Sequence, residues 1–214
     1  MTRAVLRIVV SAASPDAESI GRAAALLRGG AVAAIPTDTL YGLAADPFSA
    51  TAVQRIFAIK DRAIERALPL VASSLEQVQS RIGALTPLAR RLAERHWPGP
   101  LTLVVDAPGT LAPDVTAGGS TVGVRVPAHD VTRALCEACG HPLTATSANL
   151  SGHPATDDPD AVFRAIGDRI DLLVDAGVSP GGLPSTVVDV TGIEPRLIRA
   201  GAISWDSVLA SIRT

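Results

Sequence analysis

AVAAIPTDTLYGL, residues 31–43, is the stretch of this sequence that most strongly indicates the fold. Its first five residues are apolar and predict a buried strand that ends at Pro36. The polar residues that follow, 37–42, form a glycine-containing junction at the end of that strand. In an open α/β sheet, ligands bind where several such strand-end loops converge. The stretch therefore predicts an α/β fold with a candidate site beside Thr37, Asp38 and Thr39.

Short apolar runs alternate with amphipathic helices on both sides of this stretch. Upstream, a strand is expected at 5–10, then a helix that begins at Ser14 as N-cap with Pro15 in its first turn and ends at Gly29 and Gly30. Downstream, several late strands are too close together for helices between them, so we expect a mixed sheet. Helices are predicted from about residue 50, after Ser74, after Thr86-Pro87, around 131–138, at 160–166 and after Ser204, and strands at 68–72, 101–105, 121–126, 143–146, 172–174, 186–190 and 196–198.

Length and composition indicate one globular domain over residues 1–214, and the alternation of strands and helices indicates the α/β class. Of the residues, 47% are hydrophobic but only 3% are aromatic, so the core is expected to consist of Ala, Val, Leu and Ile. A net charge of −2 argues against a general nucleic-acid coat. Since no apolar run approaches about 18 residues and no secretion signal is recognisable, we expect a cytoplasmic protein without a membrane span.

Lys60 is the only lysine among 19 lysines and arginines, and Arg62 and Arg66 follow it closely. A lone lysine in an arginine-rich chain suggests a position that arginine cannot fill, because arginine is a planar fork and lysine a compact point charge. A helix C-terminus would also favour a cation there. That structural alternative accounts for one basic residue but not for three within seven positions, so we predict a functional basic cluster.

Four polar, glycine-bearing or hydroxyl-bearing junctions lie between the expected strands: 37–42, 118–121, 146–152 and 184–186. Each one alone could be a turn whose side chains bond their own backbone. Together they offer hydroxyls, amides and backbone N–H groups that suit phosphate and carboxylate oxygens. If the chain stays extended over 146–149, Ser147 and Asn149 point to the same side.

Arg125 is anomalous because it stands inside the apolar strand 122–126. A buried arginine needs an anionic partner. The residue types leave two partners open, a structural carboxylate such as Asp38 or the carboxylate of a ligand. Arg199, at the end of the apolar run 197–199, has the same ambiguity.

Cys136 and Cys139 form a C-x-x-C pair, which in isolation is compatible with redox or metal chemistry. They lie in a helical apolar pattern, and the chain has no second cysteine pair to complete a thiolate site, although His129 and His141 flank the helix. We therefore favour buried structural cysteines. The sequence also lacks the common nucleotide and hydrolase motifs, among them G-x-x-x-x-G-K-[ST], G-x-G-x-x-G, G-x-S-x-G and H-E-x-x-H.

Seven ordered motifs, taken together, resemble the YrdC-like family of threonylcarbamoyl-AMP synthases, in its short single-domain form, over nearly the whole chain. They are 36–43 (PTDTLYGL), 60–62 (KDR), 68–70 (LPL), 97–102 (WPGPLT), 124–127 (VRVP), 147–152 (SANLSG) and 184–189 (PSTVVD). The resemblance implies a YrdC-like fold, in which a twisted, mostly open mixed sheet flanked by helices surrounds a concave basic cavity. It also implies synthesis of L-threonylcarbamoyl-AMP and pyrophosphate from ATP, L-threonine and bicarbonate or CO₂ with Mg²⁺, the first step of threonylcarbamoyladenosine formation at position 37 of tRNA.

The resemblance further implies roles for individual residues and partners. A threonylcarbamoyl transferase complex is expected to receive the product, and contact with tRNA or double-stranded RNA is a further expectation. No residue is assigned as a metal ligand. For the contact with threonine, Thr37 is an alternative to Thr39. The family's motifs place Lys60, Arg62, Ser147 and Asn149 in catalysis, Arg62, Arg66, Thr121, Ser147 and Arg199 at ATP, and Thr39, Arg125, Ala145 and Ser185 at threonine.

Two departures from the family and two alternative functions accompany this interpretation. Val71 and Ala72 stand where some relatives place a histidine that touches threonine, and no counterpart is expected of the second domain that longer members carry. A carbamoyl-AMP-forming relative is known as one module of a hydrogenase-maturation carbamoyltransferase, embedded among zinc-finger and transferase segments that do not occur here. A free-standing RNA-binding module is the alternative that is not an enzyme, and the low net charge and scarce aromatic residues weaken it.

Overall fold

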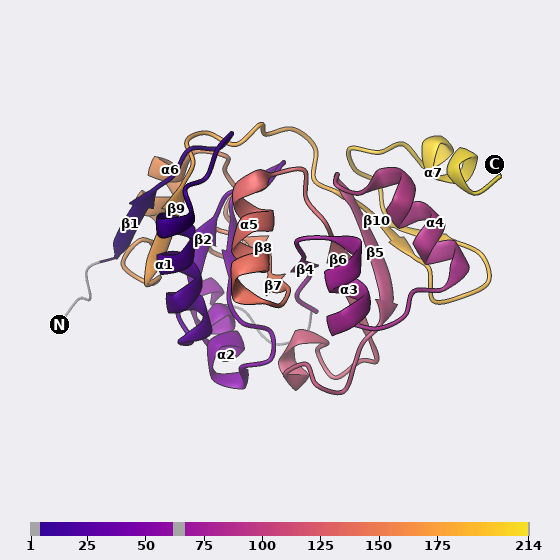
Figure 1. The fold of residues 1–214 in the computed structure, drawn as a ribbon, viewed down its shortest axis with the longest axis horizontal. Helices are drawn as coiled ribbons and strands as arrows, with labels where there is room; N and C mark the ends of the chain where they lie inside the picture. Colours follow the sequence, from indigo (N-terminus) through magenta and orange to yellow (C-terminus); the bar gives the residue numbers. More distant parts are fainter. Residues whose placement is uncertain (1–4, 62–66, 214) are drawn as a thin grey trace.

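In a computed structural model, which describes residues 5–61 and 67–213, the strands form two mixed sheets with helices packed against them (Figure 1). The mixed α/β class is thereby confirmed. The strands that the sequence suggested for one open sheet are divided between a five-stranded sheet, in the order β1-β9-β2-β3-β8, and a six-stranded sheet, in the order β11-β10-β5-β6-β4-β7. The assignment of residues 1–214 to one domain stays a prediction.

The five-stranded sheet lies between two layers of helices. Its parallel strands β1, β9 and β2 are followed by β3, which pairs antiparallel with both β2 and β8. Alternate residues of β2 enter different core clusters, which is why its sequence is apolar throughout: Ala33 and Ile35 pack with α1 and α5, and Ala34 packs with α2 and α6. The elements are β1 (Leu6–Val9), β9 (Leu172–Asp175), β2 (Ala33–Ile35), β3 (Gly42–Ala44), β8 (Thr146–Ser147), α1 (Ala17–Arg28), α5 (Asp130–Cys139), α2 (Ala50–Lys60) and α6 (Pro159–Ile166).

The six-stranded sheet is built around the antiparallel pair β5 and β6. At its far end, helices α4 and α7 lie side by side (Figure 1), where the ring Nε2 of His96 is 2.8 Å from the hydroxyl of Ser211 and Arg91 donates to the carbonyl oxygen of Ile212 at 2.8 Å. The elements are β11 (Arg196–Arg199), β10 (Thr186–Asp189), β5 (Leu101–Asp106), β6 (Thr121–Arg125), β4 (Leu70–Val71), β7 (Leu143–Thr144), α3 (Leu75–Arg81), α4 (Pro87–His96), α7 (Trp205–Arg213) and a short 3₁₀ helix, Pro113–Val115.

One short segment belongs to both sheets. β7 pairs with β4 in the six-stranded sheet, whereas β8, two residues later, pairs with β3 in the five-stranded sheet. Ala145 lies between them, and its N–H donates to the carbonyl oxygen of Pro69 at 2.8 Å. The single strand expected at 143–146 is therefore broken at Ala145, because the chain changes partner strands there.

The first helix begins two residues later than the sequence suggested. Asp16, not Ser14, is the N-cap of α1, and its carboxylate accepts from the N–H of Ser19 at 2.8 Å. Ser14 instead donates its N–H to the hydroxyl of Ser11 at 3.2 Å. A carboxylate at this position also interacts favourably with the helix dipole, which favours Asp16 over Ser14.

No helix within residues 5–61 and 67–213 is both long and apolar enough to cross a membrane.

Candidate functional site

Lys60 is the last residue of α2, and its buried ammonium group is surrounded by oxygen atoms of residues 147–149. Its Nζ donates to the main-chain oxygens of Ser147 at 2.6 Å and of Asn149 at 3.0 Å. It also lies 3.0 Å from Oδ1 of Asn149 and 3.4 Å from the hydroxyl of Ser147. A compact ammonium with three donors suits such a convergence of oxygens, which explains a lysine in an arginine-rich chain.

Ser147 and Asn149 also contact each other. The hydroxyl of Ser147 donates to Oδ1 of Asn149 at 2.6 Å, and Nδ2 of Asn149 donates to the main-chain oxygen of His153. The chain is extended only over β8, however, and bends at residues 148–149. Ser147 faces Gly42 in the β3–β8 pairing, and the N–H of Ala148 donates to the carbonyl oxygen of Tyr41 at 2.9 Å, so this junction lies against the 36–43 stretch.

Arg62 and Arg66, assigned to ATP and, for Arg62, to catalysis, lie outside the described residues. Three of the four residues matched to the family's K-x-R and S-x-N motifs, Lys60, Ser147 and Asn149, are thus placed together. The roles of all four stay predictions.

Arg125 ends β6 and forms an ion pair with Asp38, which the sequence had left open as one of two partners. Nη1 of Arg125 lies 2.9 Å from Oδ1 of Asp38, and the two side chains are only 9% and 7% exposed. Burial lowers the pKa of Arg125, while the charge of Asp38 opposes that shift and the nearby positive charge of Arg199 adds to it.

Arg199 and Ser185 form a neighbouring group at the start of β10. Nη2 of Arg199 donates to the main-chain oxygen of Ser185 at 2.8 Å and to its hydroxyl at 3.1 Å. The same hydroxyl lies 2.8 Å from that of Thr102. Thr102 belongs to the 97–102 motif, but the sequence assigned no role to it; a threonine inside the apolar run 101–105 was the available signal. Arg199, assigned to ATP, and Ser185, assigned to threonine, are therefore in direct contact.

Thr37 and Thr39 both lie in the junction after β2. Their hydroxyls are 3.1 Å apart, and that of Thr37 also donates to the carbonyl oxygen of Leu40 at 2.7 Å. Thr37 is thus engaged by its own backbone. Tyr41, two residues on, is buried and donates to the carbonyl oxygen of Gly177 at 2.8 Å, which ties this junction to the segment after β9.

Thr121 and Ala145 differ in their positions relative to these groups. Ala145 lies at the sheet crossing directly before β8 and Ser147. Thr121 starts β6, so it is separated from Arg125 by about 13 Å along the strand. The structure does not bring Thr121 next to Arg125, and its assignment to ATP stays a prediction.

The two cysteines are buried in the interface between α5 and its neighbours. The thiol of Cys136 donates to the carbonyl oxygen of Val71 at 3.3 Å, and that of Cys139 lies 3.9 Å from the carbonyl oxygen of Ala24. Burial raises the pKa of the Cys139 thiol to about 11 and raises that of Cys136 further. Protonated, packed thiols agree with the structural interpretation.

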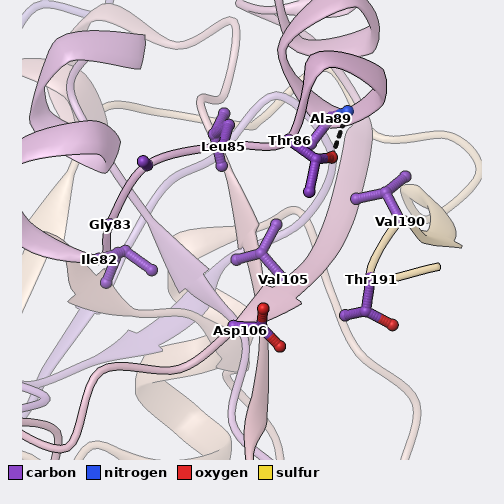
Figure 2. A pocket seen from close by; sticks show the side chains of 10 residues that line it. Ile82, Gly83, Leu85, Thr86, Ala89, Val105, Asp106, Val190 and Thr191 are labelled. Carbon is purple, nitrogen blue, oxygen red and sulfur yellow. Dashed lines mark hydrogen bonds between the residues drawn. The ribbon is translucent and has the colours of Figure 1, made fainter. Parts of the chain in front are cut away.

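Two hollows lie away from the Lys60 and Arg125 groups. A cavity of about 30 Å³ lies between the α3–α4 connection and the ends of β5 and β10. Figure 2 shows the residues that line it, among which Thr86 caps α4 by accepting from the N–H of Ala89. Its lining includes one ionisable side chain, Asp106. A wider surface hollow of about 490 Å³ is lined in part by Arg81, Phe48 and His141. The expected concave basic cavity at the candidate site stays a prediction.

Comparisons with known proteins match almost the whole chain. The family model Sua5_yciO_yrdC, described as telomere recombination, matches residues 25–201. A threonylcarbamoyl-AMP synthase of Thiobacillus denitrificans is 40% identical over 166 residues, which cover 78% of this chain and 88% of that protein. A threonylcarbamoyl-AMP synthase of Pyrococcus abyssi is 37% identical over 186 residues, which cover 87% of this chain and 55% of that protein.

A solved structure of P. abyssi Sua5 complexed with L-threonine has the same fold. It superposes with a TM-score of 0.92 at 35% sequence identity, and the match covers 97% of this chain and 61% of that one. The chain therefore spans little more than half the length of the P. abyssi relatives, whereas it matches most of the length of the T. denitrificans protein.

Proposed function

This chain belongs to the Sua5/YciO/YrdC family, and on that premise we propose that it makes L-threonylcarbamoyl-AMP and pyrophosphate from ATP, L-threonine and bicarbonate or CO₂. This synthesis is the first step of threonylcarbamoyladenosine formation at position 37 of tRNA. The names of the relatives at 37–40% identity support this assignment.

One observation carries the proposal from the family to this chain. The only lysine of the sequence reaches across 87 and 89 residues to contact Ser147 and Asn149. These three residues match the family's motifs, and the fold gives them a common location. A surface lysine that merely ends a helix would not be buried among four oxygen atoms.

The reaction needs positioned charge rather than a protein nucleophile. The threonine amine forms an N–C bond to the carbon of CO₂ or bicarbonate, with loss of a proton or of water, respectively. An oxygen of the resulting carbamate then attacks the α-phosphorus of ATP, and the bond to pyrophosphate breaks. Positioning and charge stabilisation are sufficient to accelerate such an in-line displacement.

The proposed roles follow this chemistry. Lys60 and Arg62 stabilise phosphate and carbamate oxygens, and Ser147 and Asn149 orient Lys60. Arg125 binds the threonine carboxylate, next to Ser185, Thr39 and Ala145. The guanidinium of Arg199, with Arg66, Thr121 and Ser147, contacts the nucleotide. The proximity of Arg125 and Arg199 supports adjacent sites for the amino acid and the nucleotide.

Magnesium enters the proposal as part of the substrate, MgATP. Mg²⁺ keeps several waters and binds through phosphate oxygens with few protein carboxylates. Within the described residues, no group of three or more His, Cys, Asp or Glu side chains is arranged to hold a metal ion. The proposal therefore assigns no residue as a metal ligand.

The partners of this activity are proposals as well. The product is a mixed anhydride of a carbamate and a phosphate, so it must pass to a transferase that moves the threonylcarbamoyl group to tRNA. Direct contact of this chain with tRNA or double-stranded RNA is a weaker proposal, since the net charge is only −2.

Pyrophosphate release tests the proposal. We expect release only when MgATP, bicarbonate and L-threonine are all present, and a mixture without any one of them serves as the control. L-serine should react more slowly, because loss of one methyl from a small pocket costs about 1–3 kcal/mol. Equal release without threonine would overturn the assignment, and binding of structured RNA without any release would favour an RNA-binding module.

A further inference from the structure

Asp38 and Arg125 form a buried ion pair whose hydrogen-bonding capacity is not used. Among the described residues, no hydrogen bond reaches either carboxylate oxygen of Asp38 or Nη1 of Arg125, although Oδ1 and Nη1 are 2.9 Å apart. The approach is thus close but poorly aligned. Arg–carboxylate pairs that stabilise a fold are usually well-aligned and often bidentate, and buried polar atoms usually have partners.

This arrangement is costly for the fold on its own. The attraction between two buried charges offsets the loss of their hydration only when the geometry is good and the remaining donors and acceptors are hydrogen-bonded. Buried polar atoms that remain unsatisfied in a folded protein call for an explanation, and a ligand site is one such explanation. Nη1 of Arg125 and both carboxylate oxygens of Asp38 are such atoms.

The neighbours of the pair favour an anion at Arg125. Arg199 is close enough that its positive charge lowers the pKa of Arg125, so the two guanidinium groups outnumber the one carboxylate of Asp38. His129, whose Nδ1 is also buried without a hydrogen-bond partner among the described residues, has a pKa lowered by burial, while Asp38 opposes that shift. Asp38 thus lies beside the arginine, and both of its carboxylate oxygens are buried.

We infer that Asp38 is a positioning residue, which holds the guanidinium of Arg125 so that its remaining donors face the carboxylate of the amino-acid substrate. We assign Asp38 no direct contact with that substrate, since its carboxylate pairs with the guanidinium instead. This inference rests on the proposed function for the identity of the amino acid. It predicts that Asp38 affects amino-acid binding only through Arg125.

The test compares Asp38→Asn with the wild type in threonine binding, measured by calorimetry, and in pyrophosphate release. The substitution keeps the shape of the side chain but removes its charge. We expect the threonine Kd and KM to rise at least about tenfold, with the ATP KM within about twofold of the wild type. A melting curve gives the folded fraction of each variant.

A double variant separates action through Arg125 from a general effect. Arg125→Lys alone is expected to weaken threonine binding, and adding Asp38→Asn to it should change the threonine Kd by less than about twofold. Independent effects that multiply would overturn the inference. An unchanged threonine Kd in folded Asp38→Asn protein would overturn it as well.

Asp171→Asn is the matched control, because it removes a similarly buried carboxylate from an ion pair on another element. Oδ2 of Asp171 lies 2.7 Å from Nη2 of Arg55 and accepts from the N–H of Val32 at 2.8 Å. This variant should lose stability but keep the threonine Kd. If it weakened threonine binding as much as Asp38→Asn does, the effect would be one of general destabilisation, and the inference would fall.

The outcome for the wild type separates the two proposals. Wild-type protein that binds threonine but releases no pyrophosphate contradicts the proposed function, and the binding data still decide on Asp38. Wild-type protein that binds no threonine contradicts both.

Discussion

The ammonium nitrogen of Lys60 lies 2.6 Å from the main-chain oxygen of Ser147, at the meeting point of α2 and the junction after β8. The N–H of Ser151 donates to the main-chain oxygen of Lys60 at 3.1 Å, so the two segments are joined in both directions. The lysine therefore both places a positive charge at the candidate site and supports its loop.

Lys60→Arg tests whether the compact ammonium is required. The planar guanidinium keeps the charge but does not fit where four oxygens converge on one nitrogen, so we expect turnover to fall at least about tenfold. Loss of these hydrogen bonds should also lower the free energy of unfolding by about 1–3 kcal/mol. Pyrophosphate release and urea unfolding measure the two effects. Activity that falls only in proportion to the folded fraction would show that Lys60 serves the fold alone.

Arg125→Lys tests the proposed carboxylate site. Lysine retains the charge but cannot form the bidentate pair that a guanidinium makes with a carboxylate, so we expect the threonine KM to rise while the ATP KM stays nearly unchanged. Titrations with threonine and with ATP, beside a melting curve, give the result. If stability falls and neither KM changes in the folded fraction, the ion pair with Asp38 is the whole role of Arg125.

Gly201→Ala tests how the start of β10 is held. A Cβ at residue 201 would meet the carbonyl oxygen of Pro184 and would lie 2.5 Å from the carbonyl carbon of Ser185, both of them main-chain atoms. Main-chain atoms can move aside only at a large cost in free energy. We therefore expect a loss of several kcal/mol in the free energy of unfolding, and a raised threonine KM in the protein that still folds.

The matched control for this prediction is Gly21→Ala, in the middle of α1, where an added Cβ meets nothing within 4 Å. It should gain about 0.5–1 kcal/mol, because alanine favours the helix. Similar urea midpoints for the two alanine variants would mean that the contact at Gly201 is not restrictive.

The buried thiols predict how stability depends on pH. Cys139 has a pKa of about 11 in the fold instead of the ordinary 9.0, and Cys136 is raised further, so the unfolded chain releases these protons first as the pH increases. The folded state then binds more protons, and its stability falls between about pH 9 and 11, by up to about 1.4 kcal/mol per pH unit for each thiol.

Urea unfolding in a reductant, at several pH values, checks this prediction. The double variant Cys136→Ala, Cys139→Ala should be less stable at pH 7.5 because it leaves cavities, but its stability should decline less steeply with pH than that of the wild type. Other titrating groups are the same in both proteins and cancel in the comparison. Parallel pH profiles would contradict the raised thiol pKa values.

The sequence predicted those features whose cause is local. Thr86-Pro87 predicted the start of α4, because a hydroxyl cap and an N-terminal proline act within one helical turn, and Thr86 is indeed the N-cap. The prediction of Ser14 as the N-cap of α1 was wrong, because Asp16, two residues further on, is also a favoured N-cap residue. The class of fold followed from the alternation of strands and helices, but the division into two sheets did not, because it depends on which strands pair.

The candidate site shows the same limit. Residue types and spacing pointed to Lys60, Ser147 and Asn149, and the fold brings them together. They left the partner of Arg125 open, because the approach of Asp38 depends on the alignment of β6 with the 36–41 connection across the fold. Thr102 received no predicted role, because one threonine in an apolar strand is an ordinary sequence feature.

The change of sheet at Ala145 has a consequence for how the chain assembles. β7 and β8 must find β4 and β3, strands that were synthesised about 70 to 105 residues earlier, so a large loop is closed before either pairing contributes stability. The oxygens around Lys60 come from residues 147–149 and are in place only after this closure. A nascent chain that ends before Asn149 therefore lacks two of the four oxygens around Lys60, and the surroundings of this ammonium group are complete only when the two sheets are joined.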